Sequence, residues 1–211
     1  MGYRQCDYER IDYSNLKSKK LEICSLIDER VKSKGKRGSH YKKISKKNGN
    51  YYTDFGGIYE LKCAYCGINT AINPTNMFEI DHFINGKQKK TPDGKTVNHI
   101  GNLVFSCRKC NQAKGDFHVN GAYNILHPDN GILPSIFERD DHYAIKINSK
   151  YTENKTVKGF YEKLGFSDRF RKLDYLLLNL YYLKDSKYDE KIQNTILKVY
   201  TQLLELRNKQ V

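Results

Sequence analysis

Long hydrophobic runs are missing from this sequence. The longest apolar stretch, around residues 175–183, has about nine residues, whereas a membrane-spanning helix needs about 20. The amino-terminal residues contain neither an apolar run nor a small-residue cleavage site, so we expect no signal peptide. These absences predict a cytoplasmic protein with no membrane span. In that reducing compartment the six cysteines are expected to be metal-bound thiolates or buried thiols rather than a disulfide framework.

Acidic residues are scarce relative to basic ones, and tryptophan is absent. The chain has 24 Asp and Glu against 37 Lys and Arg, a formal net charge of +13. With 38% apolar residues, 17 Tyr and 9 Phe among 211 residues, it can still bury a modest core, which excludes disorder over most of the length. The positive charge favours a polyanionic partner.

The basic excess is concentrated towards the amino terminus. Residues 31–50 contain eight Lys and Arg and no acidic residue, with glycines and serines between them, which predicts a loop or arm. Two interpretations of this arm stand: it neutralises nucleic-acid phosphates, or it is a solvated linker.

Helices are predicted at both ends of the chain. Ser14 can cap a first helix, and a polar turn at 184–189 separates two further amphipathic helices, which form a hairpin packed on the rest of the chain or on a partner protein. A short strand is expected at 143–147. Apolar residues mark the three helices: Leu16, Leu21, Ile23, Cys24, Leu26, Ile27 and Val31 in the first; Leu173, Leu176, Leu177, Leu180 and Leu183 in the second; Ile192, Ile196, Val199, Leu203 and Leu206 in the third.

Two Cys-x-x-Cys pairs, separated by 40 residues, lie in the middle of the chain: Cys63 with Cys66, and Cys107 with Cys110. Four thiolates in two such pairs suit a tetrahedral Zn²⁺ ion. With four sulfur ligands such a site is closed, so the metal would hold two distant loops together without taking part in a reaction. The alternative, four unrelated cysteines, requires the paired spacing to arise by accident. The other two, Cys6 and Cys24, are interpreted as buried thiols.

The residues around the pairs predict an ordered series of elements: a strand at 78–83, a turn-rich basic loop at 84–101, a strand at 103–105 and a short helix at 107–114. The first strand alternates apolar and polar side chains, which puts Ile80 and His82 on one face and Asp81 on the other. The order is therefore strand, loop, strand, helix, held at both ends by cysteines.

This series resembles the HNH nuclease family, whose fold is the ββα-metal motif. The residues that carry the resemblance are, in order, Cys63-x-x-Cys66, Asp81-His82, Asn102-Leu103 and Cys107-x-x-Cys110-Asn111-x-x-Lys114-Gly115-Asp116. The pattern is similar to the variant in which Asn rather than His ends the signature, as in zinc-stapled phage junction resolvases. The resemblance implies an α+β fold with a zinc-stapled ββα-metal core, an N-terminal helix and a C-terminal helical hairpin.

The resemblance also implies a role for each site residue. Asp81 and Asn111 would bind one catalytic divalent cation, Mg²⁺ or Mn²⁺, and His82 would be the general base for the attacking water. Asn102 would hold the loop and so orient the histidine. Five basic residues would contact nucleic acid: Lys87, Lys89, Lys90, Arg108 and Lys114. Apart from the family, Asn111 could instead cap the helix that follows Cys110. His99 lies in the loop and is interpreted as a surface residue, with contact to DNA as the alternative.

We expect an endonuclease that hydrolyses phosphodiesters in duplex or branched DNA. The chain is expected to comprise a helix and basic arm (1–62), a nuclease core (63–121) and a mostly helical extension (122–211). A weaker resemblance, in layout, to HNH effectors of Septu-type antiphage systems implies a role in phage defence or restriction and an ATPase partner. A homodimer would explain double-strand cutting. Two alternatives stand: a noncatalytic zinc module that docks nucleic acid or protein, and an RNA-cleaving nuclease.

Overall fold

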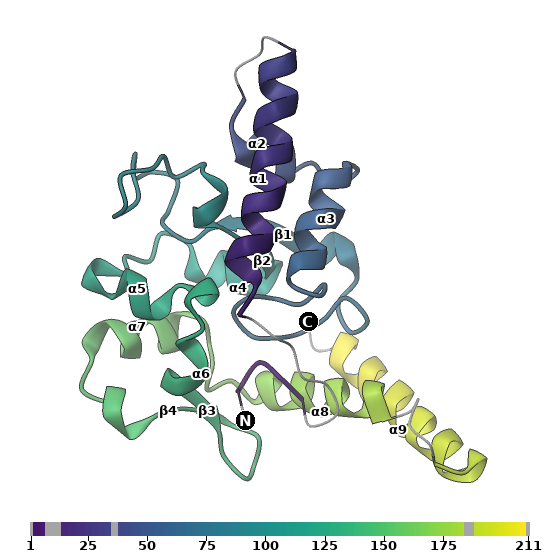
Figure 1. Cartoon of the computed structure of the whole chain (residues 1–211). Coiled ribbons are helices and arrows are strands. Elements are labelled where there is room, and N and C mark those ends of the chain that lie inside the picture. Colours follow the sequence, from purple (N-terminus) through teal and green to yellow (C-terminus); the bar gives the residue numbers. More distant parts are fainter. Residues whose placement is uncertain (1, 7–13, 35–37, 184–187, 210–211) are drawn as a thin grey trace.

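The chain folds as an α+β protein. The computed structural model describes residues 2–6, 14–34, 38–183 and 188–209 (Figure 1). Its α-helices are α1 (Leu16–Ser33), α2 (His40–Ile44), α3 (Asn50–Ile58), α4 (Arg108–Lys114), α5 (Tyr123–Leu126), α6 (Leu133–Ile136), α7 (Lys155–Lys163), α8 (Arg169–Leu183) and α9 (Glu190–Lys209). The 3₁₀ turns are η1 (Thr75–Met77), η2 (Ile100–Asn102), η3 (Asn120–Ala122), η4 (Pro128–Asn130) and η5 (Ser149–Tyr151). Two antiparallel strand pairs complete the fold: β1 (Phe78–His82) with β2 (Leu103–Cys107), and β3 (Phe137–Arg139) with β4 (Ile145–Ile147).

The β1–β2 hairpin and α4 form the centre of the molecule. The strands pair in a register that sets Ile80 opposite Phe105, and β2 is buried along its whole length. Cys107 has an extended backbone and serves as the N-cap of α4, so the helix follows β2 directly. Gly115, with φ of +50°, ends it, as a residue without a Cβ can. The predicted order of strand, loop, strand and helix is confirmed.

Helix α1 packs beside this hairpin with a narrower apolar face than the sequence predicted. Ile23 and Ile27 are buried, but Leu21 and Leu26 are 60% and 56% exposed, so these two leucines do not belong to the packed face. The N-cap is Asn15 rather than Ser14.

A lysine occupies the buried face of α1 instead. Lys20 is 3% exposed, and its ammonium group donates to the carbonyl oxygen of Leu103 and pairs with the carboxylate of Asp129. The hydroxyl of Tyr59 donates to the same carboxylate at 2.7 Å. These contacts tie α1 to β2 and to the segment after α5.

The predicted basic arm at 31–50 is partly helical. Helix α1 continues to Ser33, and α2 forms within the arm, where the side chain of Ser39 accepts a hydrogen bond from the backbone N–H of Lys42 at 3.3 Å. Residues 35–37 of the arm lie outside the described residues. The prediction of a loop is therefore wrong for residues 31–33 and 40–44, while residues 45–49 form a turn between α2 and α3.

Two aromatic groups fill the interior. Phe78 and Phe105 stack across the β1–β2 hairpin with ring centroids 4.9 Å apart. In the second group, Phe137 lies 5.4 Å from the ring of Tyr3 and 5.2 Å from that of Phe166. Because large rings bury much apolar area, the second group anchors the amino-terminal residues 2–6 against β3 and the segment after α7.

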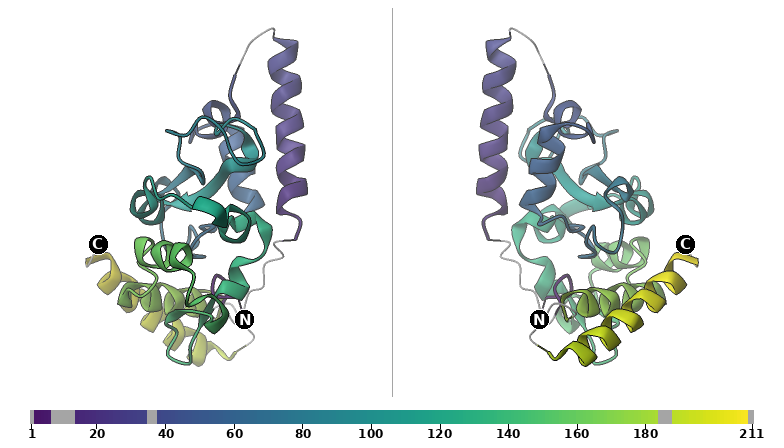
Figure 2. Two further views of the ribbon diagram at one scale, coloured as in Figure 1. Left: turned by 90° about the vertical axis from the view of Figure 1, so that its left-hand side faces the viewer. Right: turned by 90° about the vertical axis from the view of Figure 1, so that its right-hand side faces the viewer.

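Helices α8 and α9 form the predicted C-terminal hairpin, which Figure 2 shows at the end of the molecule opposite the tip of α1. Arg207 pairs with Asp174 at 2.8 Å and also donates to the side chain of Asn73, while Asn69 donates to the hydroxyl of Tyr182 at 3.3 Å. The hairpin therefore packs on the loop that follows the first cysteine pair. Its turn, predicted at 184–189, falls mostly outside the described residues. Among the helices described, none is both long and apolar enough to cross a membrane.

Candidate functional site

The cysteines of the two Cys-x-x-Cys pairs converge on one buried cluster. The sulfur atoms of Cys63, Cys66, Cys107 and Cys110 all lie within 4.8 Å of one another, and those of Cys66 and Cys107 are 3.9 Å apart. Four sulfurs held tetrahedrally at ~2.3 Å from a metal are about 3.8 Å apart. The cluster could therefore hold a metal ion between the first cysteine loop and the start of α4.

A buried guanidinium group contacts this sulfur cluster. Arg171 of α8 is 2% exposed and donates from Nη2 to the sulfur of Cys110 at 3.2 Å and to the carbonyl oxygen of Leu164 at 2.8 Å. Burial lowers the pKa of Arg171, but the sulfurs of Cys110, Cys66 and Cys107 raise it overall. A buried cation needs a negative partner. The contact therefore favours thiolates, the form in which cysteine binds metal.

Asp81 lies on the side of β1 that faces α4 and is 6% exposed. Its Oδ2 accepts a hydrogen bond from the hydroxyl of Tyr65 at 2.6 Å and lies 3.3 Å from Nζ of Lys114. Burial raises the pKa of Asp81 to about 6, against the opposing effects of Lys114 and Tyr65. This carboxyl group is therefore shielded from water and ionises close to neutral pH.

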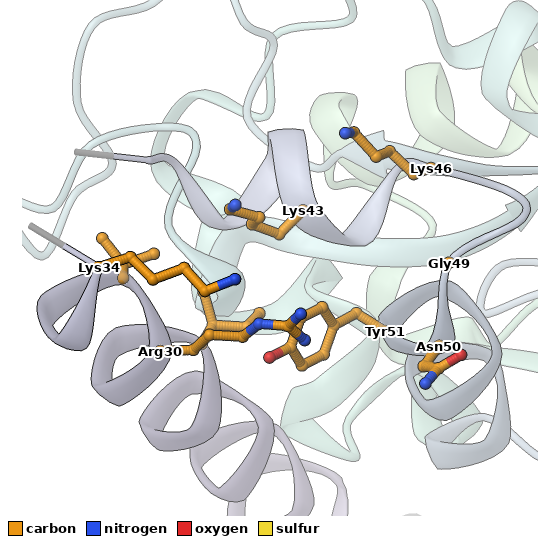
Figure 3. Close-up of a pocket in the computed structure, with 9 residues that line it drawn as sticks. Arg30, Lys34, Lys43, Lys46, Gly49, Asn50 and Tyr51 are labelled. Carbon is orange, nitrogen blue, oxygen red and sulfur yellow. The ribbon is translucent and has the colours of Figure 1, made fainter. Parts of the chain in front are cut away.

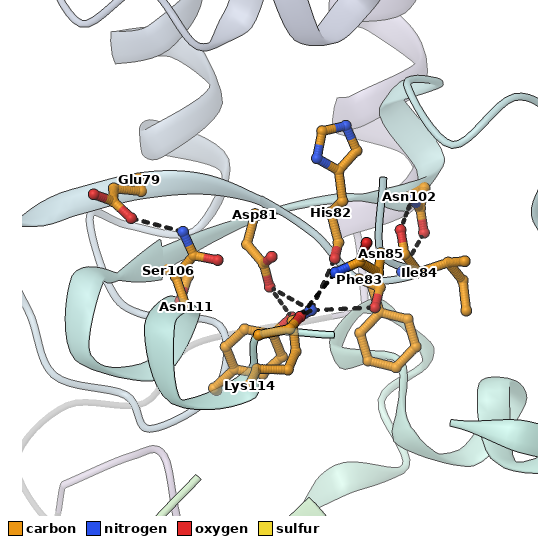
Figure 4. Close-up of polar contacts among 12 residues, drawn as sticks. Glu79, Asp81, His82, Phe83, Ile84, Asn85, Asn102, Ser106, Asn111 and Lys114 are labelled. Carbon is orange, nitrogen blue, oxygen red and sulfur yellow. Dashed lines mark hydrogen bonds and ion pairs between the residues drawn. The ribbon is translucent and has the colours of Figure 1, made fainter. Parts of the chain in front are cut away.

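Glu79, two residues before Asp81, holds the amide of Asn111. Asn111 donates from Nδ2 to Oε2 of Glu79 at 2.6 Å, and Arg108 donates to Oε1 at 2.9 Å. Burial raises the pKa of Glu79, but these two hydrogen bonds lower it overall. A carboxylate can only accept hydrogen bonds, so the amide nitrogen must face Glu79. Figure 4 shows the Asn111 oxygen pointing toward the side of Asp81.

Glu79 was not among the residues predicted for the site. A signal was present, because the alternation that places Asp81 on one face of β1 places Glu79 on the same face.

The structure also decides one alternative left open for Asn111. Cys107 is the N-cap of α4 and Asn111 lies a full turn inside the helix, so the interpretation of Asn111 as its cap is wrong.

His82 ends β1, and its imidazole points away from Asp81 (Figure 4). Its Nε2 lies 2.9 Å from Oδ1 of Asn98, and the ring of Tyr41 packs on it with centroids 4.2 Å apart. Because an amide oxygen only accepts, Nε2 carries the proton and Nδ1 has a lone pair that can accept one. Burial lowers the pKa of His82, so the imidazole is neutral near pH 7.

Asn102 connects the two ends of the loop between β1 and β2. The residue is 1% exposed, and its Nδ2 donates to the carbonyl oxygens of Ile84 at 3.0 Å and Val97 at 2.8 Å. Its Oδ1 accepts the backbone N–H of Ile84 at 2.8 Å. These contacts suit the positional role expected for Asn102, because they close the loop that follows His82.

Lys114 does not lie where the sequence analysis expected it. Its side chain is 1% exposed, and Nζ donates to the carbonyl oxygens of His82 at 2.9 Å and Phe83 at 3.4 Å in addition to its pairing with Asp81. The expected contact with a phosphate does not fit this placement. Lys114 neutralises Asp81 from inside the protein.

The other basic residues expected to contact nucleic acid lie at the surface: Lys87, Lys89 and Lys90 in the loop after β1, and Arg108 at the start of α4. Lys87 pairs with Asp116 at 3.3 Å, an exposed contact that a phosphate can replace. Arg108 is half-exposed and is already bonded to Glu79.

A further group of basic side chains lines a pocket between α1, α2 and α3 (Figure 3). Its polar lining residues are Arg30 and Lys34 from the end of α1, Lys43 and Lys46 from α2 and the turn after it, and Asn50 and Tyr51 from α3. None of the described residues that line it is acidic. Cations around an aromatic ring suit nucleic-acid phosphates and bases. Helix α2 also carries Tyr41, whose ring packs on His82.

The central segment of the chain matches a known protein family. Residues 63–117, from the first cysteine pair to the residues just after α4, match the family model described as HNH endonuclease. The segment is an HNH domain, and the predicted resemblance is confirmed. HNH endonucleases act on nucleic acid and use divalent metals. No curated protein and no solved structure matches the chain.

Proposed function

We propose that the HNH domain at residues 63–117 is a metal-dependent endonuclease that hydrolyses phosphodiester bonds in DNA. His82 is its general base, and Asp81 and Asn111 are the protein ligands of the catalytic cation. The observation that carries the proposal is the hydrogen bond that Nδ2 of Asn111 donates to Glu79. This bond leaves the side-chain oxygen of Asn111 pointing toward the side of Asp81. Two oxygen atoms that can bind a metal, one on β1 next to His82 in the chain and one on α4, thus lie near each other.

Asp81 and Asn111 offer the donor atoms of a hard divalent cation. Carboxylate and amide oxygens suit Mg²⁺ or Mn²⁺ better than a metal that prefers sulfur. When bound, such a cation offsets negative charge on the phosphate and on the departing oxygen. Lys114 pairs with Asp81, and Glu79 orients Asn111, so both oxygen ligands are held by neighbouring groups.

His82 accepts the proton of the attacking water at Nδ1. Asn98 holds the opposite ring nitrogen, and the lowered pKa keeps the ring neutral and able to act as a base. Asn102 closes the loop that follows His82 and so limits its movement. Attack on phosphorus with departure of the 3′ oxygen gives products that carry 5′ phosphates.

The proposed substrate is DNA; the net charge of +13 and the basic pocket beside α2 support a nucleic-acid substrate. RNA offers the same phosphates, so RNA cleavage by this site is the first alternative. A noncatalytic zinc module is the second, and it predicts no role for Asp81 or His82.

The test is incubation of the purified full-length chain with supercoiled plasmid in Mg²⁺, Mn²⁺ or EDTA. We expect nicking or linearisation with either metal, none in EDTA, and loss of activity in His82→Ala with the fold intact. His142→Ala, which changes an exposed histidine in the β3–β4 turn, is the matched control and should cleave like the wild type. Equal cleavage by His82→Ala would remove His82 as the base.

A labelled RNA incubated in parallel separates the alternatives. Degradation of RNA beside intact plasmid would favour the RNA-cleaving enzyme. Failure to cleave either polymer with any metal would favour the noncatalytic module.

The cysteine cluster is proposed to hold structural Zn²⁺, because four sulfur ligands leave no position for a substrate. The ATPase partner, the homodimer and the role in phage defence or restriction stay predictions. Co-purification from the native cell and light scattering of the purified chain test the first two.

A further inference from the structure

A second group of metal-ligating side chains lies apart from the four-cysteine cluster. Cys24 of α1, His40 at the start of α2 and His99 just before η2 have candidate ligand atoms within 4.8 Å of one another. Asp28, one helical turn after Cys24, adds a carboxylate. We infer that these four residues form a second metal site, which binds a divalent cation of the zinc class.

The distances between these side chains match those between ligands of one tetrahedral ion. The sulfur of Cys24 lies 3.6 Å from Nε2 of His40 and 3.7 Å from Oδ2 of Asp28, and Nε2 of His40 lies 3.1 Å from Oδ1 of Asp28. With bonds of ~2.3 Å to sulfur and ~2.0 Å to nitrogen or oxygen, neighbouring ligands of zinc are about 3.3–3.5 Å apart. The rings of His40 and His99 have centroids 5.1 Å apart.

The donor atoms select the kind of metal. One thiolate and two imidazoles favour a borderline cation such as Zn²⁺ over Mg²⁺ or Ca²⁺, which prefer oxygen. A metal ion in solution can reach the cluster from the side of Asp28, whose side chain is 65% exposed, although Cys24 itself is only 9% exposed. The site therefore differs in chemistry from the pair of oxygen donors at Asp81 and Asn111.

The same residues do not fit an activated catalytic thiol. In such a site the histidine contacts the thiol with one ring nitrogen and a carboxylate with the other. Here Cys24 and Asp28 both face Nε2 of His40, and Nδ1 accepts the backbone N–H of Ile100 at 3.1 Å. Burial and the carboxylate of Asp28 also raise the pKa of Cys24. Coordination to a cation is what would make this sulfur a thiolate.

Metal binding here exchanges protons in a defined way. The cation replaces the thiol proton of Cys24, which leaves to solvent, and the proton on Nε2 of His40. Each imidazole stays neutral by carrying its proton on the ring nitrogen that does not bind the cation. In His40 this nitrogen is Nδ1, which then no longer accepts the N–H of Ile100, so this backbone amide changes its partner when the metal binds. Nδ1 of His99 accepts the backbone N–H of Gly101 at 3.1 Å, and this amide loses its acceptor in the same way.

The site joins segments that contact His82. Tyr41, next to His40, packs on the imidazole of His82, and Asn98, next to His99, is hydrogen-bonded to it. The backbone N–H of Tyr41 also donates to the carbonyl oxygen of Asn98 at 3.3 Å. A cation that holds His40 and His99 together would therefore brace both neighbours of His82 against α1.

The first experiment measures metal content. The full-length chain is loaded with Zn²⁺, freed of excess by gel filtration and analysed by mass spectrometry of the metal. We expect two zinc ions per chain in the wild type and in Cys6→Ser, a buried cysteine outside both clusters, and one in Cys24→Ser and His99→Gln. One zinc per chain in the wild type, or equal zinc in the wild type and Cys24→Ser, would overturn the proposal.

The second experiment needs no variant, so a substitution that unfolds the chain cannot obscure the answer. X-ray absorption of the zinc-loaded wild type should give an average of about 2.5 sulfur ligands per zinc, the mean of a four-sulfur and a one-sulfur site. The nuclear magnetic resonance signal of the Ile100 amide should shift with the second equivalent of zinc. Four sulfur ligands per zinc, or an Ile100 signal that does not respond, contradicts the site.

Discussion

At the scale of single residues, the contact between Glu79 and Asn111 determines which atom of the Asn111 amide faces Asp81. Glu79→Ala removes the acceptor of the Asn111 N–H, so the amide can rotate and its oxygen is no longer held. Loss of a group that orients a metal ligand typically costs 10–100-fold in affinity. We therefore expect the Mg²⁺ concentration for half-maximal plasmid cleavage to rise by about 10–100-fold, measured by titration with Mg²⁺.

The matched control for this titration is Glu138→Ala, which removes an exposed glutamate from β3. Its Mg²⁺ requirement should equal that of the wild type. If Glu79→Ala also behaves like the wild type, Asn111 needs no orienting partner.

Lys114 is expected to act through stability. Lys114→Met leaves the buried carboxylate of Asp81 without its counter-charge. Removing one partner of a buried ion pair typically costs 3–5 kcal/mol, so we expect the free energy of unfolding at pH 8 to fall by about that amount in urea titrations. Lys87→Met, at an exposed pair, should change it by about 0.5 kcal/mol or less. Equal effects of the two substitutions would show that burial of Lys114 does not matter.

At the scale of elements, the first cysteine loop depends on a close approach to the amino-terminal segment. Gly67 has φ of +80°, and a Cβ there would lie 2.3 Å from the carbonyl oxygen of Arg4. Gly67→Ala must strain the loop or displace residues 2–6. We expect it to destabilise the protein by more than the ~1 kcal/mol of an average substitution and to speed loss of zinc to a chelator, measured by urea unfolding and metal release.

Gly57→Ala is the opposite case and serves as the control. Gly57 lies in α3, and a Cβ there would meet no atom within 4 Å. Alanine in a helix interior is favoured over glycine by roughly 0.5–1 kcal/mol, so this variant should gain stability and retain zinc. A similar loss in both variants would refute the role assigned to the approach of Gly67 to Arg4.

The elements around the site could be predicted because each leaves a strong local pattern. These patterns each extend over only a few residues: the spacing within each cysteine pair, the alternation along β1 and the glycine that follows α4. Helix α2 could not be predicted in the same way. It has five residues, and tertiary contacts of Tyr41 with His82 and of His40 with Ile100 hold it in place.

The buried charges of the protein are harder to predict from the sequence. Lysine is normally exposed, so neither Lys20 nor Lys114 is expected to be buried, although Lys20 follows Leu16 by four residues and so falls on the apolar face of α1. Their partners, Asp129 and Asp81, lie far away along the chain and meet them only after folding. For the same reason the sequence alone indicates a buried thiol at Cys24 and a surface residue at His99, until the fold brings both to His40.

At the scale of the whole molecule, the buried network at Lys20 makes stability depend on pH. His127 lies 3.8 Å from the carboxylate of Asp129, which pairs with Lys20. Burial lowers the pKa of His127 to about 4, with Asp129 opposing and Lys20 and Lys17 adding to the effect. Between pH 6.5 and 4 the unfolded chain binds a proton at His127 and the folded chain does not. This residue therefore makes stability fall as pH falls through that window.

His127→Gln removes this contribution. The displacement from 6.5 to about 4 corresponds to about 3 kcal/mol, so the variant should gain up to about that much relative to the wild type as pH falls from 7 to 4. Asp81 also makes stability depend on pH, and because its pKa is raised, its contribution rises as pH falls. This contribution is present in both proteins, so the difference between them isolates His127. Urea unfolding across this range measures it, and the exposed-site variant His142→Gln should follow the wild type. A difference that does not change with pH would contradict the prediction.

The basic pocket should determine how nucleic-acid binding responds to salt. A triple variant with Lys34, Lys43 and Lys46 changed to Gln removes three charges from the pocket. Each lost phosphate contact reduces the slope of log affinity against log salt by about 0.9 on duplex DNA. We expect the slope to fall by up to about 3, measured by fluorescence anisotropy with labelled duplex in a His82→Ala background so that no cleavage occurs.

The control for this measurement must remove the same net charge elsewhere. Lys150, Lys158 and Lys163 are exposed around α7, which Figure 1 shows well away from α2. Changing these three to Gln lowers the net charge equally, so a purely long-range attraction to the +13 chain predicts the same loss of slope in both triple variants. A larger loss in the pocket variant means that phosphates contact this surface. DNA would then pass along α2, beside the residues that hold His82.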